Sequence, residues 1–144
     1  MGKQPPSIRD SYPMFRTVQT RWHDNDIYGH MNNGIHYQIF DTVVNGWLME
    51  QELLTLDAPD TCFIVAETGC RYHAELRFPS DVYAGMKLER LGGSAVIWNI
   101  GLFADGEETA AAEGRFVHVF CRRDGLVPQP MPEEVRAKFA PLAQ

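Results

Sequence analysis

The sequence predicts an α+β fold in which an antiparallel sheet of about five strands is wrapped around one long central helix. One segment in the first half of the chain carries apolar residues at helical spacing, and four later segments show the alternation typical of strands. Short turns separate these later segments, which favours an antiparallel meander. Because a single helix with a wide apolar face has to be covered, the sheet is expected to curve around it.

The first half of the chain is expected to contain an arm, a strand and the helix. Residues 1–13 are largely polar and are predicted to form a flexible arm, which a single domain over residues 14–140 follows. Met14 to Trp22 alternates imperfectly and is predicted to be a strand. A helix is predicted from about Gly34 to Leu54, because apolar residues recur there at helical spacing: Ile35, Ile39, Phe40, Val43, Val44, Trp47 and Leu48.

The second half of the chain is expected to supply most of the sheet. Turn signals at Phe78 to Asp81, Gly92-Gly93 and Asp105-Gly106 separate the strand candidates. A short helix is expected near the C-terminal end, over Glu133 to Phe139. The predicted strands are Cys62 to Leu76, Val82 to Leu91, Ser94 to Ala104 and Thr109 to Cys121.

Composition and charge favour a cytoplasmic globular protein. The net charge of −6 disfavours nucleic acid and an anionic membrane surface as partners. The three cysteines, an odd number inside apolar segments, favour buried free thiols in a reducing compartment. No apolar run reaches the roughly 18 residues of a transmembrane helix, so no membrane partner is expected.

The densest group of reactive side chains lies in residues 21–33, between the first strand and the helix. This stretch holds two carboxylates, two imidazoles and three carboxamides. Asn32 or Asn33 is expected to cap the helix, because a short carboxamide can accept hydrogen bonds from the first free N–H groups. These N–H groups and the positive end of the helix dipole could stabilise a negative charge that develops in a reaction.

The loop and the helix start resemble those of a known enzyme family. The matching residues are Arg21-Trp22-x-Asp24-x-Asp26-x-x-Gly29-His30-Met31-Asn32-Asn33, followed by His36-Tyr37 and Phe40-Asp41. This pattern is similar to that of the hotdog-fold acyl-CoA thioesterases, and most similar to the branch named after 4-hydroxybenzoyl-CoA thioesterase. The element order fits as well, so the resemblance covers about Phe15 to Arg136.

The resemblance implies a function and an assembly. It implies hydrolysis of an aryl- or short- to medium-chain acyl-CoA thioester to the free acid and coenzyme A, without a cofactor and without a metal. It also implies self-association into a homodimer or homotetramer, because one small sheet around one helix leaves an unprotected edge.

Roles for individual residues follow from the same resemblance. Asp26 aligns with the catalytic carboxylate of the family, a base or nucleophile, and Asn33 aligns with the residue whose backbone N–H forms the oxyanion hole. A carboxylate and one N–H at a helix terminus are a sufficient minimum for thioester hydrolysis. His36 stands where the family usually has tyrosine, so the acyl pocket is expected to differ. Substrate contacts are implied for Gly29, His30, Asn32, His36 and Tyr37.

Other interpretations of these residues remain open. Asp24 is expected to be structural and paired with Arg21, and Asn32 can brace the loop instead of contacting substrate. His118, in a predicted strand, is expected to be a core or interface histidine. The main alternative function is a non-catalytic acyl-CoA-binding or regulatory hotdog protein, although such a protein would be expected to lose the carboxylate of Asp26.

A metal site is a weaker alternative. A glycine and flanking asparagines do not fix a coordination shell, and no cysteine lies nearby in sequence. The ligand-type residues of that hypothesis are His23, Asp24, Asp26, His30 and His36.

Overall fold

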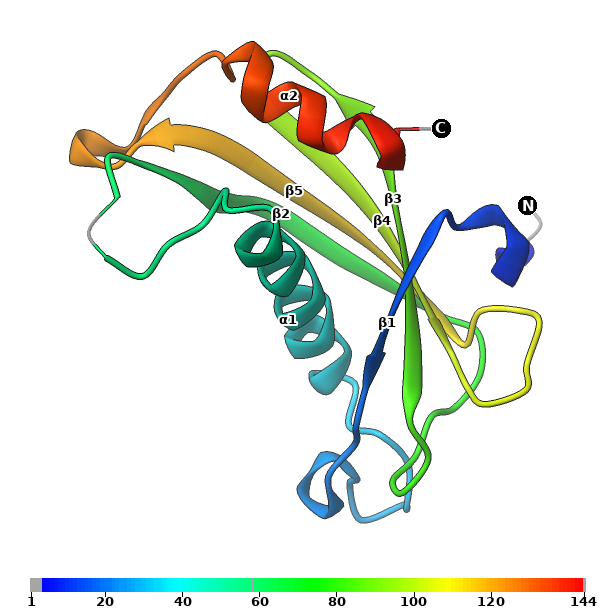
Figure 1. Ribbon diagram of the computed structural model, residues 1–144. Helices are drawn as coiled ribbons and strands as arrows, with labels where there is room; N and C mark the ends of the chain where they lie inside the picture. The colour runs from blue at the N-terminus through cyan, green and yellow to red at the C-terminus, as the bar shows by residue number, and fades with distance from the viewer. Residues whose placement is uncertain (1–3, 58, 144) are drawn as a thin grey trace.

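The computed structural model describes residues 4–57 and 59–143 of the chain. In this part of the chain, one antiparallel sheet is accompanied by a long and a short α-helix (Figure 1). The strands lie in the order β1-β3-β4-β5-β2, and the short β6 pairs with β5. The elements are β1 (Met14–Val18), α1 (Ile35–Glu50), β2 (Thr61–Tyr72), β3 (Val82–Leu91), β4 (Ala95–Phe103), β5 (Ala112–Arg122), β6 (Val127–Pro128) and α2 (Glu133–Phe139).

The sheet curves like half of a barrel, and α1 lies against its concave side (Figure 1). Trp47 of α1 contacts Trp98 of β4 and Phe139 of α2, with ring centroids 5.4 and 5.1 Å apart. The predicted α+β class, with one apolar helix face packed on an antiparallel sheet, is therefore confirmed. The buried residues of the predicted stripe are Ile39, Phe40, Val43, Val44, Trp47 and Leu48.

The helix is shorter than the sequence predicted, and the sheet covers one side of it without enclosing it. α1 ends at Glu50 and not near Leu54. Glu52 adopts a left-handed φ of 60°, and the N–H of Leu53 donates to the carbonyl of Leu48 at 2.8 Å. This is the Schellman arrangement that ends many helices, here without its usual glycine. Because no glycine marks the stop, the sequence prediction placed the end of the helix too late.

The strand order also differs from the predicted meander. β3, β4 and β5 follow one another as expected, but β2 pairs with β5, and β1 lies beside β3. Directly after β2, the chain still lies beside the start of β5. The N–H groups of His73 and Ala74 donate to the carbonyl of Ala111 at 2.8 and 2.9 Å. β2 therefore forms an edge of the sheet, and its last residue, Tyr72, hydrogen bonds to a residue just before α1.

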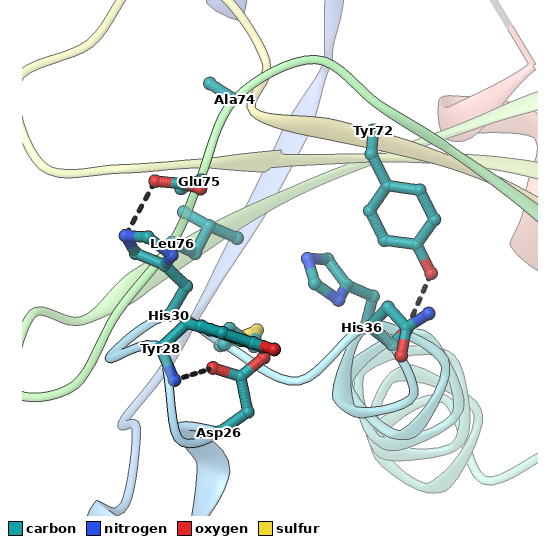
Figure 2. A pocket seen from close by; sticks show the side chains of 10 residues that line it. Asp26, Tyr28, His30, His36, Tyr72, Ala74, Glu75 and Leu76 are labelled. Atoms are coloured by element: carbon teal, nitrogen blue, oxygen red, sulfur yellow. Dashed lines mark hydrogen bonds and ion pairs between the residues drawn. The ribbon is translucent and has the colours of Figure 1, made fainter.

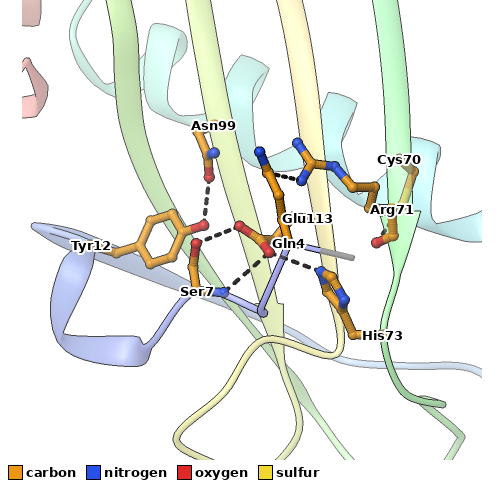
Figure 3. Close-up of polar contacts among 8 residues, drawn as sticks. All are labelled: Gln4, Ser7, Tyr12, Cys70, Arg71, His73, Asn99 and Glu113. Carbon is orange, nitrogen blue, oxygen red and sulfur yellow. Dashed lines mark hydrogen bonds and ion pairs between the residues drawn. The ribbon is translucent and has the colours of Figure 1, made fainter. Parts of the chain in front are cut away.

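Residues 4–13, most of the predicted arm, lie against the outer face of the sheet (Figure 3). The ring of Tyr12 lies on Gly85 and Gly101, where any Cβ would come within 2.6 and 2.7 Å of it. The Tyr12 hydroxyl donates to the side-chain oxygen of Asn99 at 2.5 Å. The first three residues of the arm lie outside the described residues, and the domain boundary after residue 13 stays a prediction.

The cysteines of the described chain are free, as expected. Cys121 is buried, as predicted, whereas the prediction of burial is wrong for Cys62 and Cys70, which are partly exposed. Burial raises the pKa of the Cys70 thiol to about 11. No helix within residues 4–57 and 59–143 is long and apolar enough to cross a membrane.

Candidate active site

The loop before α1 is held together by its own backbone and by Asp24. The buried carboxylate of Asp24 accepts hydrogen bonds from the backbone N–H of Arg21 at 2.8 Å and from its guanidinium at 2.8 and 3.1 Å. The carbonyl of Asp24 accepts from the N–H of Asn32 at 2.8 Å. Asp24 therefore has the structural role that the sequence predicted, and its pairing with Arg21 is confirmed.

Asp26 lies at the tip of this loop, and its carboxylate faces a cavity of about 650 Å³ (Figure 2). Its Oδ1 accepts from the N–H of Tyr28 at 2.8 Å, and its backbone N–H donates to the carbonyl of His30 at 2.8 Å. Gly29 closes the turn with a φ of 79°, a conformation that L side chains rarely adopt, and donates to the carbonyl of Asp26 at 3.1 Å. These bonds fix the direction of the Asp26 side chain.

The start of α1 lies on the other side of the same cavity. Gly34 is the N-cap residue, whereas the sequence suggested Asn32 or Asn33. The side-chain oxygen of Asn32 instead accepts from the N–H of Gly34 at 2.9 Å. The backbone carbonyl of Asn32 accepts from the N–H of Ile35 at 2.9 Å. The N–H of Asn33 makes no hydrogen bond with any residue that the structure describes, and Asn33 lines the cavity.

Two histidines complete the polar lining of the cavity. The Nε2 of His30 lies 2.8 Å from a carboxylate oxygen of Glu75, which comes from the segment after β2. His36 is 3% exposed, and its Nδ1 has no hydrogen-bond partner among the described residues. Burial lowers the pKa of His36, while the nearby carbonyls of Asn32 and Asn33 partly oppose this shift.

Some predicted contacts lie apart from this cavity. Tyr37 does not line it, and its ring packs against Phe40 with centroids 5.9 Å apart. Gly29 lines a second hollow of about 580 Å³ on another side of the loop, together with Trp22 and Ile27. Asp26 lines both hollows.

The sequence did not identify several residues that line the cavity. Tyr72, Ala74, Glu75 and Leu76 all belong to the end of β2 and the segment after it. The predicted strand Cys62 to Leu76 contains all four residues, but nothing in the sequence indicated that the strand ends at Tyr72, beside the loop. The N–H of Met31 donates to the carbonyl of Leu76 at 2.7 Å, and this bond joins the two segments.

His118 lies in the core, and the described residues contain no cluster that could bind a metal ion. His118 is buried in the core between Phe63 and Phe116, with ring centroids 5.7 and 4.8 Å away. Burial lowers its pKa to about 4. Nowhere in the described chain do three His, Cys, Asp or Glu side chains come close enough together to hold a metal ion.

Comparison with known proteins places this geometry in a family. The sequence matches the thioesterase-like superfamily over residues 20–139. The crystal structure of the PA5185 protein from Pseudomonas aeruginosa strain PAO1 is 41% identical, with a TM-score of 0.92, and the match covers 97% of this chain and 98% of that chain. No curated protein matches the sequence significantly.

Two more distant structures carry functional names. A thioesterase from Thermus thermophilus, complexed with coenzyme A and Zn, is 26% identical with a TM-score of 0.75, over 91% of this chain and 95% of that one. Slr0204, a 1,4-dihydroxy-2-naphthoyl-CoA thioesterase from Synechocystis, is 12% identical with a TM-score of 0.78, over 88% of this chain and 94% of that one, and shows the fold alone. The family and the enzyme class predicted from the sequence are confirmed: the chain belongs to the thioesterase-like superfamily and is a thioester hydrolase with the hotdog fold.

Proposed function

We propose that this protein is an acyl-CoA thioesterase that hydrolyses an aryl- or short- to medium-chain acyl-CoA thioester to the free acid and coenzyme A. The single observation that carries this proposal is that Asp26 and Asn33 line the same cavity. One supplies a carboxylate and the other, just before a helix, an N–H without a hydrogen-bond partner among the described residues. These are the two groups that thioester hydrolysis needs. The thioesterase from Thermus thermophilus that binds coenzyme A supports the choice of thiol.

The proposed reaction uses Asp26 in one of two ways. As a base, the carboxylate takes a proton from water while the water oxygen attacks the thioester carbon. As a nucleophile, it attacks that carbon itself, and water then hydrolyses the resulting anhydride. In both cases the carbonyl oxygen becomes an oxyanion that the N–H of Asn33 stabilises, and the C–S bond breaks to release the thiolate of coenzyme A.

The proposed substrate contacts have unequal support. His30 and His36 line the cavity with Asp26, and its apolar wall, formed by Met31 and Leu76, suits the acyl group. The side chain of Asn32 already accepts a hydrogen bond from Gly34, and Gly29 and Tyr37 do not line this cavity. We therefore assign the acyl contacts first to His30 and His36 and treat Gly29, Asn32 and Tyr37 as contacts of lower priority.

We also infer a cytoplasmic homodimer or homotetramer. β2 is an edge strand of 12 residues whose Val65 and Tyr72 are each 46% exposed. An exposed strand edge of this length invites pairing with a second copy of the chain. Such pairing would cover the open side of β2 next to the cavity.

A panel of thioesters tests the proposed function. Aryl-, short-chain and medium-chain acyl-CoA substrates are incubated with the protein, and release of the free thiol is measured. We expect turnover of at least one class, and almost none of it with Asp26→Asn. A folded wild-type protein that hydrolyses none of these substrates would contradict the proposal and favour a non-catalytic acyl-CoA-binding role.

A further inference from the structure

Tyr72 connects the edge of the sheet to the start of α1. Its hydroxyl donates a hydrogen bond of 2.6 Å to the backbone carbonyl of Asn33. Its ring meets the imidazole of His36 edge to face, with centroids 4.8 Å apart and an interplanar angle of 83°. Figure 2 shows Tyr72 reaching from the strand across to the helix terminus, with His36 beside it.

The other bonds at the helix start are mostly internal to the loop. The bonds from Gly34 and Ile35 to Asn32 shape the turn but do not fix its position relative to the sheet. The bond from Met31 to Leu76 lies two residues before Asn33 in the chain. For Asn33 itself, the described residues offer one hydrogen bond to the sheet, and Tyr72 donates it.

We propose that Tyr72 is a positioning residue for thioester hydrolysis, which holds the backbone of Asn33 at the place where its N–H meets the oxyanion. This inference rests on the proposed function. Tyr72 acts through Asn33 and does not itself react. Tyr72 is partly exposed, but partial desolvation raises the pKa of its hydroxyl, which stays a hydrogen-bond donor across neutral pH.

The size of the expected effect follows from geometry. A misplacement of about 1 Å in a catalytic group can cost about 100-fold in rate. The oxyanion exists only in the transition state and the intermediate, so a displaced N–H lowers kcat and leaves KM nearly unchanged. Tyr72→Phe removes the hydroxyl and keeps the ring beside His36. We expect kcat to fall about 10- to 100-fold, with KM within about threefold of wild type.

A matched variant controls for the loss of a hydrogen-bonded hydroxyl. Tyr12→Phe removes a hydroxyl that donates to Asn99 on the outer face of the sheet. We expect Tyr12→Phe to keep the wild-type kcat and KM. Equal losses of kcat in both variants, or an unchanged kcat in Tyr72→Phe beside an active wild type, would overturn the inference while leaving the proposed function intact.

Two further measurements test whether Tyr72 acts through Asn33. In the Asn33→Pro background, which lacks the N–H, adding Tyr72→Phe should cause no further loss of kcat; multiplicative losses would overturn the inference. Hydrogen exchange measured by mass spectrometry on a peptide covering residues 31–40 gives a readout without activity. We expect faster exchange in Tyr72→Phe than in wild type or Tyr12→Phe, and equal exchange in all three proteins would contradict the proposed clamp. A wild-type protein without thioesterase activity would overturn the proposed function, and the catalytic part of this inference with it.

Discussion

The ring of Phe40, on α1, lies directly on the backbone of Gly114 in β5. A Cβ at Gly114 would overlap three carbon atoms of that ring. The missing side chain of one strand residue therefore sets how closely the helix approaches the sheet. Because the helix start carries part of the candidate active site, this contact links core packing to the geometry of the site.

Gly114→Ala is expected to destabilise the protein. Phe40 is fully buried, so its ring has little room to move away from an added methyl group. Overpacking of this kind costs about 1–3 kcal/mol in the free energy of unfolding, which urea denaturation measures. Gly69→Ala is the control, because no atom of the described residues lies within 4 Å of a Cβ there. We expect stability to stay equal or rise by roughly 0.5 kcal/mol.

Asp26→Asn is expected to lower kcat at least about 100-fold, within the usual range for the loss of a base. The amide oxygen of asparagine can still accept the hydrogen bond from the N–H of Tyr28, so the loop should keep its shape. Thiol release and circular dichroism on the same samples check both statements. An Asp26→Asn protein as active as wild type would falsify the assignment of this carboxylate.

Asp24→Asn should show the opposite behaviour. The side chain of Asp24 is 6% exposed and holds Arg21, which is largely exposed itself. Loss of a charged hydrogen-bond partner at such a site costs about 1–3 kcal/mol. We expect a lower urea midpoint and a kcat close to that of wild type in the folded protein. A collapse of kcat without loss of stability would move the catalytic role from Asp26 to Asp24.

Asn33→Ala and Asn33→Pro separate the side chain of Asn33 from its backbone. The N–H of Asn33 makes no hydrogen bond within the described chain, so proline removes no native bond from the fold. We expect Asn33→Ala to keep most of its activity and Asn33→Pro to lose most of it. Equal damage in two equally folded and oligomeric variants would show that the side chain carries the role.

His118 should make stability depend on pH. Burial lowers its pKa to about 4, whereas an unfolded histidine titrates near 6.5. The unfolded chain therefore binds more protons between these values, so stability rises with pH across this window and is lost as pH falls below about 6.5. Between pH 7 and pH 5 we expect a loss of roughly 2 kcal/mol from this group.

Urea denaturation at these two pH values checks the prediction, with His118→Leu as the comparison. The leucine variant should lose most of the slope, although His36, whose pKa is lowered as well, contributes in the same direction. An unchanged slope in His118→Leu would mean that His118 titrates normally in the folded protein.

The open edge of β2 should pair with a second copy. Wild-type protein is expected to be at least a dimer in light scattering at micromolar concentration. Val65→Lys places a charge on this edge and should shift the protein toward the monomer. Leu56→Lys is the control, because Leu56 is exposed and lies outside the strands. A wild-type monomer under these conditions would contradict the predicted assembly.

The sequence by itself determined the elements and the chemistry of the loop. Helical spacing identified the buried face of α1, and the bounds of α2 agree with the prediction. The motif around Asp26 and Asn33 identified the family, because the residues of the motif follow one another within one loop. These features depend on local periodicity and local turn chemistry, which a single chain shows directly.

The tertiary structure decided what lies opposite that loop. Tyr72 reaches Asn33 across 39 positions of sequence, and Glu75 meets His30 in the same way. Both contacts exist because β2 pairs with β5 at the sheet edge and ends beside the helix start. A strand pattern gives the face on which a side chain lies, but the position of the strand in the sheet depends on every other strand competing for the same place. For that reason the candidate catalytic loop was predictable from the sequence, while the residues that face it were not.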